Sequence, residues 1–481
     1  MFQTNCLLCH DAACTKACGA YEPDRILRSL YFDNEAVVLN GMDEIPCIGC
    51  DGRCREACPV HIDIRELISS LESKRKTKRT FDYGTLKTDF CGISLESPFL
   101  LSSSVVASTY EMCARAFEEG WAGAAFKTIC LMDIVEASPR FSAIKGDNGR
   151  LIGFKNIEQL SDHALIENMK IFRKLKDDYP DKFLLVSIMG RNDEEWAYLA
   201  DLLNDSGADA LELNFSCPNM TEGNTGSDVG QMPELVEHYC RIVREHSRLP
   251  FIAKLTPNVT HINDAADAAI RGGADGVAAI NTIKSLIEVD IDPKDGIFNA
   301  SIGGYSGKAV KPIALRFIAE LSQNRELKGK YISAMGGIET WRDALEFIVL
   351  GADTVQVTTA VMQYGYRIIK DMKDGLALYM EEHGYGSLKE LKRSAIKGIV
   401  PTEELDRSYI IYPKFKRDRR LACGRCYLSC MDGGHQAIAF KDGRPVLDPA
   451  KCVGCHLCVL VCPNEAIVSS DIKTPKNRKG E

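Results

Sequence analysis

Between about residue 81 and residue 400, short apolar runs alternate with longer segments whose apolar positions recur with helical period. This alternation is typical of βα repeats and predicts a parallel sheet. The expected strands are Phe99–Ser103, Ala124–Lys127, Phe183–Ile188, Ala210–Asn214, Phe251–Lys254, Gly276–Ile280, Tyr331–Met335 and Thr354–Val357. The expected helices begin at Thr109, Asp193, Met232, Ile262, Lys311, Glu339 and Val361. About eight units predict a (β/α)8 barrel of the TIM type, with an open doubly wound sheet as the alternative.

The residues at the ends of these strands are polar or small, unlike the strands themselves. They are Lys127, Asn214, Lys254, Asn281, Thr282, Gly336, Gly337, Thr358 and Thr359. Active sites of barrels lie at the carboxyl ends of the strands, and a phosphate commonly binds the loops after strands seven and eight. The glycine pair and the threonine pair match such a phosphate site, and Ser306 with Gly307 would add a third wall. No G-x-G-x-x-G follows a strand, so no dinucleotide-binding half is visible.

One strand end carries a candidate catalytic group. The buried run Ala210–Asn214 is followed by Phe215, Ser216, Cys217 and Pro218, and proline stops the strand from continuing. A thiol with an ordinary pKa of about 8.5 is protonated near neutrality, so Cys217 suits a general acid better than a nucleophile. The competing interpretation is that Cys217 is a small buried hydrophobe.

Composition and charge narrow the class of protein. The net charge of −8 carries no overall basic bias toward nucleic acid, and no apolar stretch is long enough to span a membrane. The chain also lacks a basic start followed by an apolar core, so we expect a soluble, cytoplasmic protein. Of the 20 cysteines, 15 lie near the two ends, where they suit metal or cluster ligands in a reducing compartment.

The amino-terminal residues 1 to 80, which we expect to form a helical domain, hold two runs of four cysteines. The first run is Cys6, Cys9, Cys14 and Cys18, and the second is Cys47, Cys50, Cys54 and Cys58 followed by Pro59. Such runs favour paired 4Fe–4S clusters, with paired zinc sites as the alternative. The last cysteine of each run often crosses to the other cluster, which would group Cys58 with the first run and Cys18 with the second. The basic stretch from Lys74 to Arg79 predicts a linker.

The carboxyl-terminal residues 401 to 481 hold a ferredoxin motif. Cys452, Cys455, Cys458 and Cys462 precede Pro463 with the spacing C-x2-C-x2-C-x3-C-P of bacterial ferredoxins. The companion run of Cys423, Cys426 and Cys430 is incomplete, because Arg420 stands where its first cysteine would be. We expect one complete cluster, on Cys430, Cys452, Cys455 and Cys458. The neighbouring site, on Cys423, Cys426 and Cys462, has three irons, uses another ligand such as Asp418, or is absent.

Several motifs of the central region carry a family resemblance. They are Phe126–Thr128, Asn156–Glu158, Leu213–Pro218, Ala253–Asn258, Asn281–Thr282 and Gly303–Gly307. They resemble the FMN barrel of dihydropyrimidine dehydrogenases and, more broadly, dihydroorotate dehydrogenases. The resemblance implies FMN ligands at Lys127, Lys254, Gly336, Gly337 and Thr359. It implies substrate ligands at Asn156, Glu158, Asn214, Asn281 and Thr282.

The amino-terminal cysteine runs resemble the cluster domain of the glutamate synthase small subunit and of dihydropyrimidine dehydrogenase. That likeness implies that electrons enter here from an FAD and NAD(P)H flavoprotein subunit or from a ferredoxin. A homodimer or hetero-oligomer is also implied. The resulting expectation is a reductase of uracil or thymine, or the reverse enzyme. The alternatives are a dihydroorotate dehydrogenase-like oxidoreductase, a tRNA dihydrouridine synthase and an electron-relay subunit whose barrel is a scaffold.

Overall fold

The protein is described by a computed structural model covering residues 6–40, 47, 49–72, 81–146, 149–220, 223, 225–292 and 301–476. The chain forms two compact units, Met1–Lys397 and Gly398–Glu481. The expected linker from Lys74 to Arg79 lies outside the described residues. No helix of the described chain is long and apolar enough to cross a membrane.

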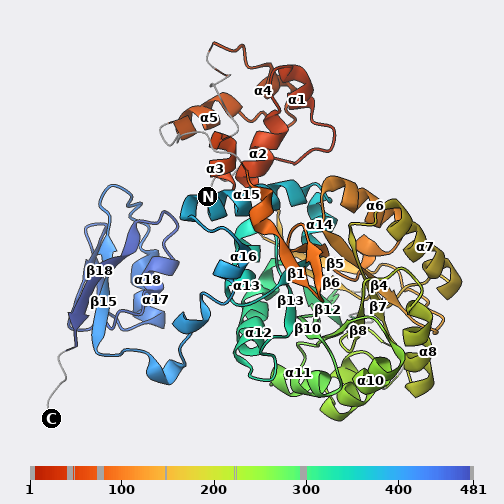
Figure 1. The fold of residues 1–481 in the computed structure, drawn as a ribbon. Coiled ribbons are helices and arrows are strands. Elements are labelled where there is room, and N and C mark those ends of the chain that lie inside the picture. The colour runs from red at the N-terminus through yellow and green to blue at the C-terminus, as the bar shows by residue number, and fades with distance from the viewer. Residues whose placement is uncertain are drawn as a thin grey trace, which may run out of the picture. The chain divides into compact units, whose positions relative to one another are not determined.

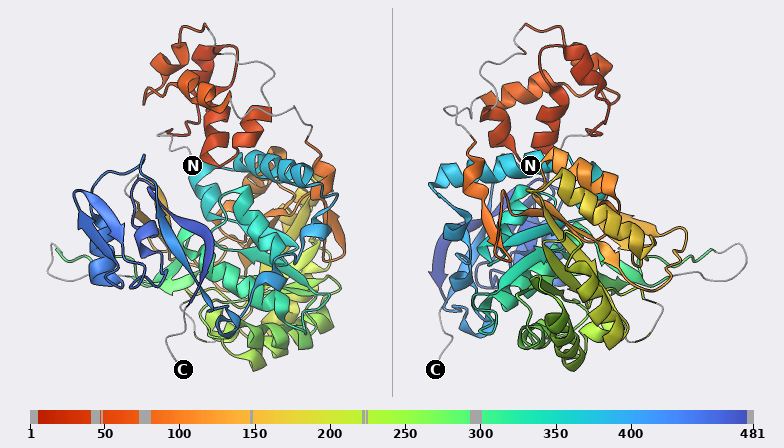
Figure 2. Two further views of the ribbon diagram at one scale, coloured as in Figure 1. Left: turned by 90° about the vertical axis from the view of Figure 1, so that its left-hand side faces the viewer. Right: turned by 45° about the vertical axis from the view of Figure 1, so that its right-hand side comes forward.

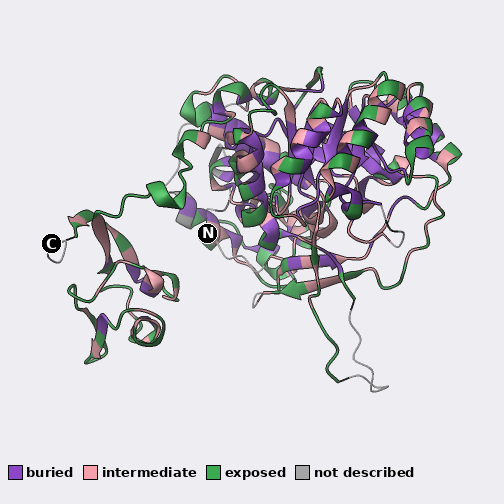
Figure 3. Cartoon of the chain, turned by 90° about the horizontal axis from the view of Figure 1, so that it is seen from below, coloured by how far each residue is buried: buried purple, intermediate pink, exposed green. Residues whose placement is uncertain are grey.

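Eight parallel strands close into a barrel in the first unit (Figure 1). In barrel order they are Phe99–Leu101 (β3), Gly123–Ile129 (β4), Phe183–Ile188 (β7), Ala210–Asn214 (β8), Phe251–Lys254 (β9), Gly276–Ala279 (β10), Tyr331–Met335 (β13) and Thr354–Val357 (β14). Nearly every residue of these strands is buried (Figure 3). Strands buried on both faces need continuous apolar runs, which is why the pattern revealed them. The predicted barrel is confirmed, and the open doubly wound sheet is wrong.

Helices surround the strands (Figures 1 and 2). They are Tyr110–Glu119 (α6), Leu165–Asp178 (α7), Asp193–Leu203 (α8), Ser227–Gly230 (α9), Pro233–His246 (α10), Ile262–Arg271 (α11), Lys311–Gln323 (α12), Trp341–Val349 (α13), Thr359–Tyr364 (α14), Ile368–His383 (α15) and Leu388–Leu391 (α16). Several begin at side-chain caps: Thr109 accepts from Met112 N, and Asn192 accepts from Glu195 N. The helix α7 was absent from the sequence-based prediction.

A second sheet was not predicted. Its antiparallel strands run in the order Ile283–Ser285 (β11), Gly303–Ser306 (β12), Leu151–Asn156 (β6) and Phe141–Lys145 (β5). The register places Gly304 opposite Asn156, so this sheet brings residues of two distant loops together. A separate hairpin joins Thr88–Phe90 (β1) to Ile93–Leu95 (β2).

The amino-terminal part is helical, as predicted. Its helices are Ala13–Cys18 (α1), Pro23–Tyr31 (α2), Glu35–Asn40 (α3), Arg53–Ala57 (α4) and Ile64–Glu72 (α5). Asp371 of α15 accepts hydrogen bonds from Arg28 Nε and Ser29 Oγ, both at 2.8 Å. The side chains of Arg28 and Asp371 are only 11% and 5% exposed, so this ion pair is buried where α2 meets the barrel.

Replacing Asp371 with alanine should loosen the amino-terminal helices from the barrel. The substitution leaves Arg28 as an unpaired buried charge, which costs about 3–5 kcal/mol. Limited proteolysis should therefore release residues 1 to 80 faster while the barrel stays resistant. The matched control is Asp33→Ala, which removes a largely exposed pair with Arg342 worth at most about 1 kcal/mol. Equal cleavage rates in the two variants would show that the buried pair does not hold this junction.

The second unit is a small ferredoxin-like domain. It contains Tyr409–Phe415 (β15) paired antiparallel with Ile467–Pro475 (β18), and Ile438–Lys441 (β16) paired antiparallel with Arg444–Leu447 (β17). Its helices are Arg425–Gly433 (α17) and Leu457–Leu460 (α18). Their inner faces carry cysteines, and Cys426, Cys458, Ile438 and Ile467 form the core. The predicted carboxyl-terminal ferredoxin-like domain is confirmed.

Candidate active site

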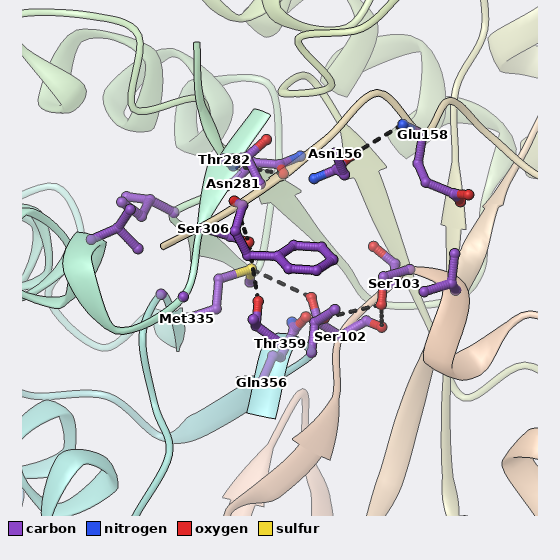
Figure 4. A pocket seen from close by; sticks show the side chains of 18 of the residues that line it. Ser102, Ser103, Asn156, Glu158, Asn281, Thr282, Ser306, Met335, Gln356 and Thr359 are labelled. Carbon is purple, nitrogen blue, oxygen red and sulfur yellow. Dashed lines mark hydrogen bonds between the residues drawn. The ribbon is translucent and has the colours of Figure 1, made fainter. Parts of the chain in front are cut away.

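One cavity at the carboxyl ends of the barrel strands gathers the barrel residues expected to be ligands or catalytic groups. Figure 4 shows part of its lining, including Asn156, Asn281 and Thr359. Its lining includes Lys127, Asn156, Glu158, Asn214, Cys217, Lys254, Asn281, Thr282, Ser306, Gly307, Gly336, Gly337, Thr358 and Thr359. The barrel strand ends supply most of them, while β6 and β12 of the second sheet supply Asn156 and Ser306. The structure thus brings the candidates together, and their individual roles stay predictions.

Lys254 is held by a buried carboxylate. Its Nζ lies 3.1 Å from Oε1 of Glu212 on β8, and their side chains are 3% and 0% exposed. Ser103 Oγ accepts from Lys254 Nζ at 2.7 Å, and Gln356 Nε2 donates to Glu212 Oε2 at 3.1 Å. The network fixes one positive charge at the floor of the cavity, because a buried lysine needs a carboxylate and hydrogen bonds to stay charged.

Lys127 belongs to a second ion-pair network. Its Nζ lies 2.7 Å from Glu158 Oε2 and 3.6 Å from Glu136 Oε1. Arg140 Nη1 lies 2.6 Å from the other oxygen of Glu158. Both lysines that line the cavity are therefore already paired with carboxylates.

A chain of amides and hydroxyls crosses the cavity. Asn214 Nδ2 donates to Thr128 Oγ1, Ser216 Oγ donates to Asn214 Oδ1, and Asn281 Nδ2 donates to Ser216 Oγ, each at 2.8 Å. Thr282 N donates to Asn281 Oδ1 at the same distance. These bonds fix the orientation of both amides, and a fixed amide offers a donor and an acceptor in one plane.

Cys217 is a buried thiol beside these amides, with 6% of its surface exposed. The pKa of the Cys217 thiol is raised to about 11, mainly by burial and also by the charge of Glu136, while a hydrogen bond with the Asn219 backbone and the charges of Lys254 and Lys127 partly offset the rise. The Cys217 carbonyl accepts from Ser227 N at 2.9 Å, which ties down the loop. The thiol therefore carries its proton at neutral pH.

A cradle of backbone forms another part of the lining. Gly307, Gly336 and Gly337 have φ of 87°, 122° and 77°, which L side chains rarely adopt. A Cβ added at Gly337 would lie 2.8 Å from Lys311 Cβ and 2.9 Å from the Gly307 carbonyl. Ser306 Oγ and Thr359 Oγ1 are 3.0 Å apart, so hydroxyls and bare backbone share this wall.

Gly337→Ala should weaken anion binding at this wall. The added Cβ meets backbone, so the loop must shift as well as accept a strained φ, and we expect loss of bound flavin mononucleotide at equal protein concentration. Gly365→Ala is the control, because Gly365 also has positive φ of 82° but nothing lies within 4 Å of an added Cβ. Flavin absorbance per chain after desalting is the measurement. Retention of flavin by Gly337→Ala would contradict the cradle.

The sequence missed several residues of the site. Glu212 and Gln356 lie inside strands whose apolar runs hid them. Arg140 and Glu339 also went unnoticed; burial raises the pKa of the Glu339 carboxyl, which lines the cavity, to about 7. Ser102 and Ser103 follow β3 as polar residues at a strand end, so the rule that found Lys254 also applied to them.

Most of the amino-terminal cysteines lie in one core cluster, which holds Cys6, Cys14, Cys18, Cys47, Cys54 and Cys58. Burial raises the pKa of Cys6, and the nearby Cys9 and Cys58 raise it further. Burial likewise raises the pKa of Cys47, with further increases from Cys50, Cys54 and Cys18. This arrangement is compatible with the crossed grouping, which stays a prediction.

The carboxyl-terminal cysteines also form two groups. Cys430, Cys452, Cys455 and Cys458 line one apolar cavity. Burial raises the pKa of Cys426, and charge on Cys423 and Cys462 raises it further, so these three thiols are neighbours. Within the described residues no three His, Cys, Asp or Glu side chains are arranged as ligands of a single metal ion.

Comparisons with known proteins agree with this architecture. Residues 85–380 match the family model of dihydroorotate dehydrogenase, and residues 414–469 match that of a 4Fe–4S dicluster domain. A solved dihydroorotate dehydrogenase from Eimeria tenella shares the fold, with a TM-score of 0.54 at 18% identity over 68% of this chain and 93% of that one.

Sequence relatives define the family more closely. The NAD-dependent dihydropyrimidine dehydrogenase subunit PreA of Escherichia coli K12 is 53% identical over 82% of this chain and 97% of its own. The chloroplastic dihydropyrimidine dehydrogenase (NADP+) of Arabidopsis thaliana is 37% identical over 64% of this chain and 76% of its own. The catalytic subunit of dihydroorotate dehydrogenase B (NAD+) from Pyrococcus abyssi is 39% identical over 65% and 99%. The chain therefore belongs to the dihydropyrimidine dehydrogenase family of oxidoreductases, built on the barrel of dihydroorotate dehydrogenases.

Proposed function

We propose that this chain interconverts uracil or thymine with the 5,6-dihydropyrimidine, using FMN in the barrel cavity and exchanging electrons through iron–sulfur clusters. The observation that carries the proposal is the composition of the cavity. Neutral amides and hydroxyls face a buried thiol there, and both lining lysines are already ion-paired. A uracil ring offers two carbonyls and two N–H groups, which amides recognise well.

The cavity fits FMN on three observations. Gly307, Gly336 and Gly337 have positive φ and line the cavity with bare backbone, as a phosphate bound to backbone amides requires. Gln356 Oε1 is buried without a hydrogen-bond partner among the described residues, so it can accept from a ligand N–H. The ammonium of Lys254 would stabilise negative charge on a reduced ring system. Ser306, Thr358, Thr359 and Lys127 complete the proposed set.

Cys217 is the proposed proton donor. When bound and reduced, FMN would supply a hydride to one carbon of the pyrimidine 5,6 double bond. The Cys217 thiol donates a proton to the other carbon. Its raised pKa keeps the thiol protonated at neutral pH, so the proton is available when the substrate binds. Asn214 and Asn281 hold the substrate in plane, with Asn156, Glu158 and Thr282 at its edge.

The second candidate is a dihydroorotate dehydrogenase-like activity, which is supported by the matches to that family. Dihydroorotate carries a carboxylate, and a site that binds it would be expected to contain a cationic side chain that is not already paired. The lining residues include two lysines, and Glu158 and Glu212 already pair with them. The uncharged pyrimidines therefore fit better.

Steady-state turnover with a chemical electron donor decides between the two candidates. Uracil and thymine should be reduced, and orotate should not. Reduction of orotate at a rate equal to that of uracil would favour the second candidate and exclude the specificity argued here.

Electrons are proposed to reach the cavity through the cysteine-bound clusters from another protein. The relative from Escherichia coli is named a subunit, which supports a partner for this chain as well. We expect that partner to be an NAD(P)H flavoprotein subunit or a ferredoxin. The amino-terminal module of residues 1 to 80 would hold two clusters, and the carboxyl-terminal domain the others.

A further inference from the structure

The carboxyl-terminal domain contains two unequal groups of thiols. Four of them, Cys430, Cys452, Cys455 and Cys458, share a cavity whose other walls include Pro413, Ile438 and Leu447. That group has the number of thiolates that a cubane cluster takes. The other group consists of Cys423, Cys426 and Cys462, with Cys426 buried at the start of α17.

The missing fourth position is occupied by Arg420. Its Nε donates to the Arg417 carbonyl at 3.4 Å, and a guanidinium has no lone pair to offer iron. Arginine also stays protonated in proteins, so no pH change turns it into a ligand.

Neighbouring side chains do not replace the missing thiol. Asp418 is exposed, whereas Cys426 belongs to the domain core and Cys462 packs against that core. Both ring nitrogens of His456 already form hydrogen bonds. Nε2 bonds to the Ile411 carbonyl at 2.8 Å, and Nδ1 bonds to Ser469 Oγ at 2.7 Å. His435 lines the other cavity.

We propose that Cys423, Cys426 and Cys462 bind a three-iron cluster, so the dicluster domain of this chain holds one cubane and one 3Fe–4S cluster. The inference departs from the matched 4Fe–4S dicluster family and rests on the iron–sulfur role proposed above. The physical reason is that a fourth iron would lack a thiolate ligand, because Arg420 replaces the cysteine that the motif has at this position.

The test compares the full chain with Arg420→Cys, both purified without oxygen and left unreduced. The wild type should give the paramagnetic signal of an oxidised three-iron cluster at about one spin per chain. Arg420→Cys should lose that signal and gain about one iron atom per chain, because a cubane can then form. Arg420→Ala is the matched control and should keep both the signal and the iron content of the wild type.

A second measurement needs no variant. Ferrous iron and a dithiol added to the wild type should abolish the signal, since the three-iron cluster takes one Fe²⁺ and one electron from the dithiol to become a cubane. Two results overturn the inference. One is a wild type without the signal and with the iron content of Arg420→Cys, which means a non-cysteine fourth ligand. The other is a wild type about four irons poorer than Arg420→Cys, which means an empty site.

These readouts are separate from the proposed pyrimidine chemistry. Bleaching of the flavin by dihydropyrimidine takes place in the barrel cavity and does not require this cluster. If the three-iron signal is absent but the flavin is bleached, only the three-iron site is refuted. If the signal is present but the flavin is not bleached, only the proposed pyrimidine activity is refuted.

Discussion

Cys217→Ala should lower the rate of uracil reduction by roughly 10²- to 10⁴-fold, the usual contribution of a positioned general acid. Flavin and iron content should stay unchanged, because Cys217 is not among the proposed ligands of FMN or of the clusters. The matched control is Cys240→Ala, which removes another fully buried thiol, from α10, away from the cavity. Full activity in Cys217→Ala would remove the thiol from the mechanism.

The pH dependence gives the same role a second readout. Because the pKa of Cys217 is raised to about 11, the thiol keeps its proton below that pH and loses it only as the pH rises through that value. Reduction of uracil should thus be insensitive to pH between about 7 and about 9. The reverse reaction needs the thiolate, so its rate should rise about tenfold per pH unit over the same range. A reduction rate that falls steeply above about pH 7 would contradict the buried, protonated thiol.

Lys254→Met should strongly lower the stability of the barrel. It leaves the carboxylate of Glu212 buried and uncompensated, which costs about 3–5 kcal/mol. The midpoint of urea unfolding should fall accordingly. Flavin binding should be lost as well, since the one ammonium fixed at the cavity floor is gone.

The double variant Lys254→Met with Glu212→Gln separates these two effects. Neutralising both partners removes the buried charge, so most of the lost stability should return. The amide oxygen at position 212 can still accept from Gln356, and its NH2 group can donate to the Ser103 hydroxyl. Flavin binding and turnover should stay low. If the double variant binds flavin as the wild type does, Lys254 serves the fold alone.

The barrel was predictable because each of its strands is buried on both faces. Five strands, β7, β8, β9, β13 and β14, have the bounds that the apolar runs gave. The helix α7 was missed because the excursion through β5 and β6 separates it from β4, so the alternation of strand and helix breaks there. The second sheet was missed because its partners, such as β6 and β12, are distant in sequence and partly exposed.

The residues of the site also divide into those that the sequence predicted and those that it did not. Residues at strand ends were predictable, because strand register alone carries them to one rim of the barrel. Their partners depend on which strands become neighbours. Gln356 of β14 reaches Glu212 across the barrel interior, and Arg140 reaches Glu158 only after the second sheet forms. No local pattern records those contacts.

The pairing of flavin and dihydropyrimidine in one cavity is the claim on which the rest depends. It is tested most directly by adding dihydrouracil to the purified, oxygen-free chain and following the flavin absorbance band. We predict about one FMN per chain, bleached by dihydrouracil and by dihydrothymine. A chain that holds no flavin after reconstitution, or a flavin that neither compound bleaches, would contradict it.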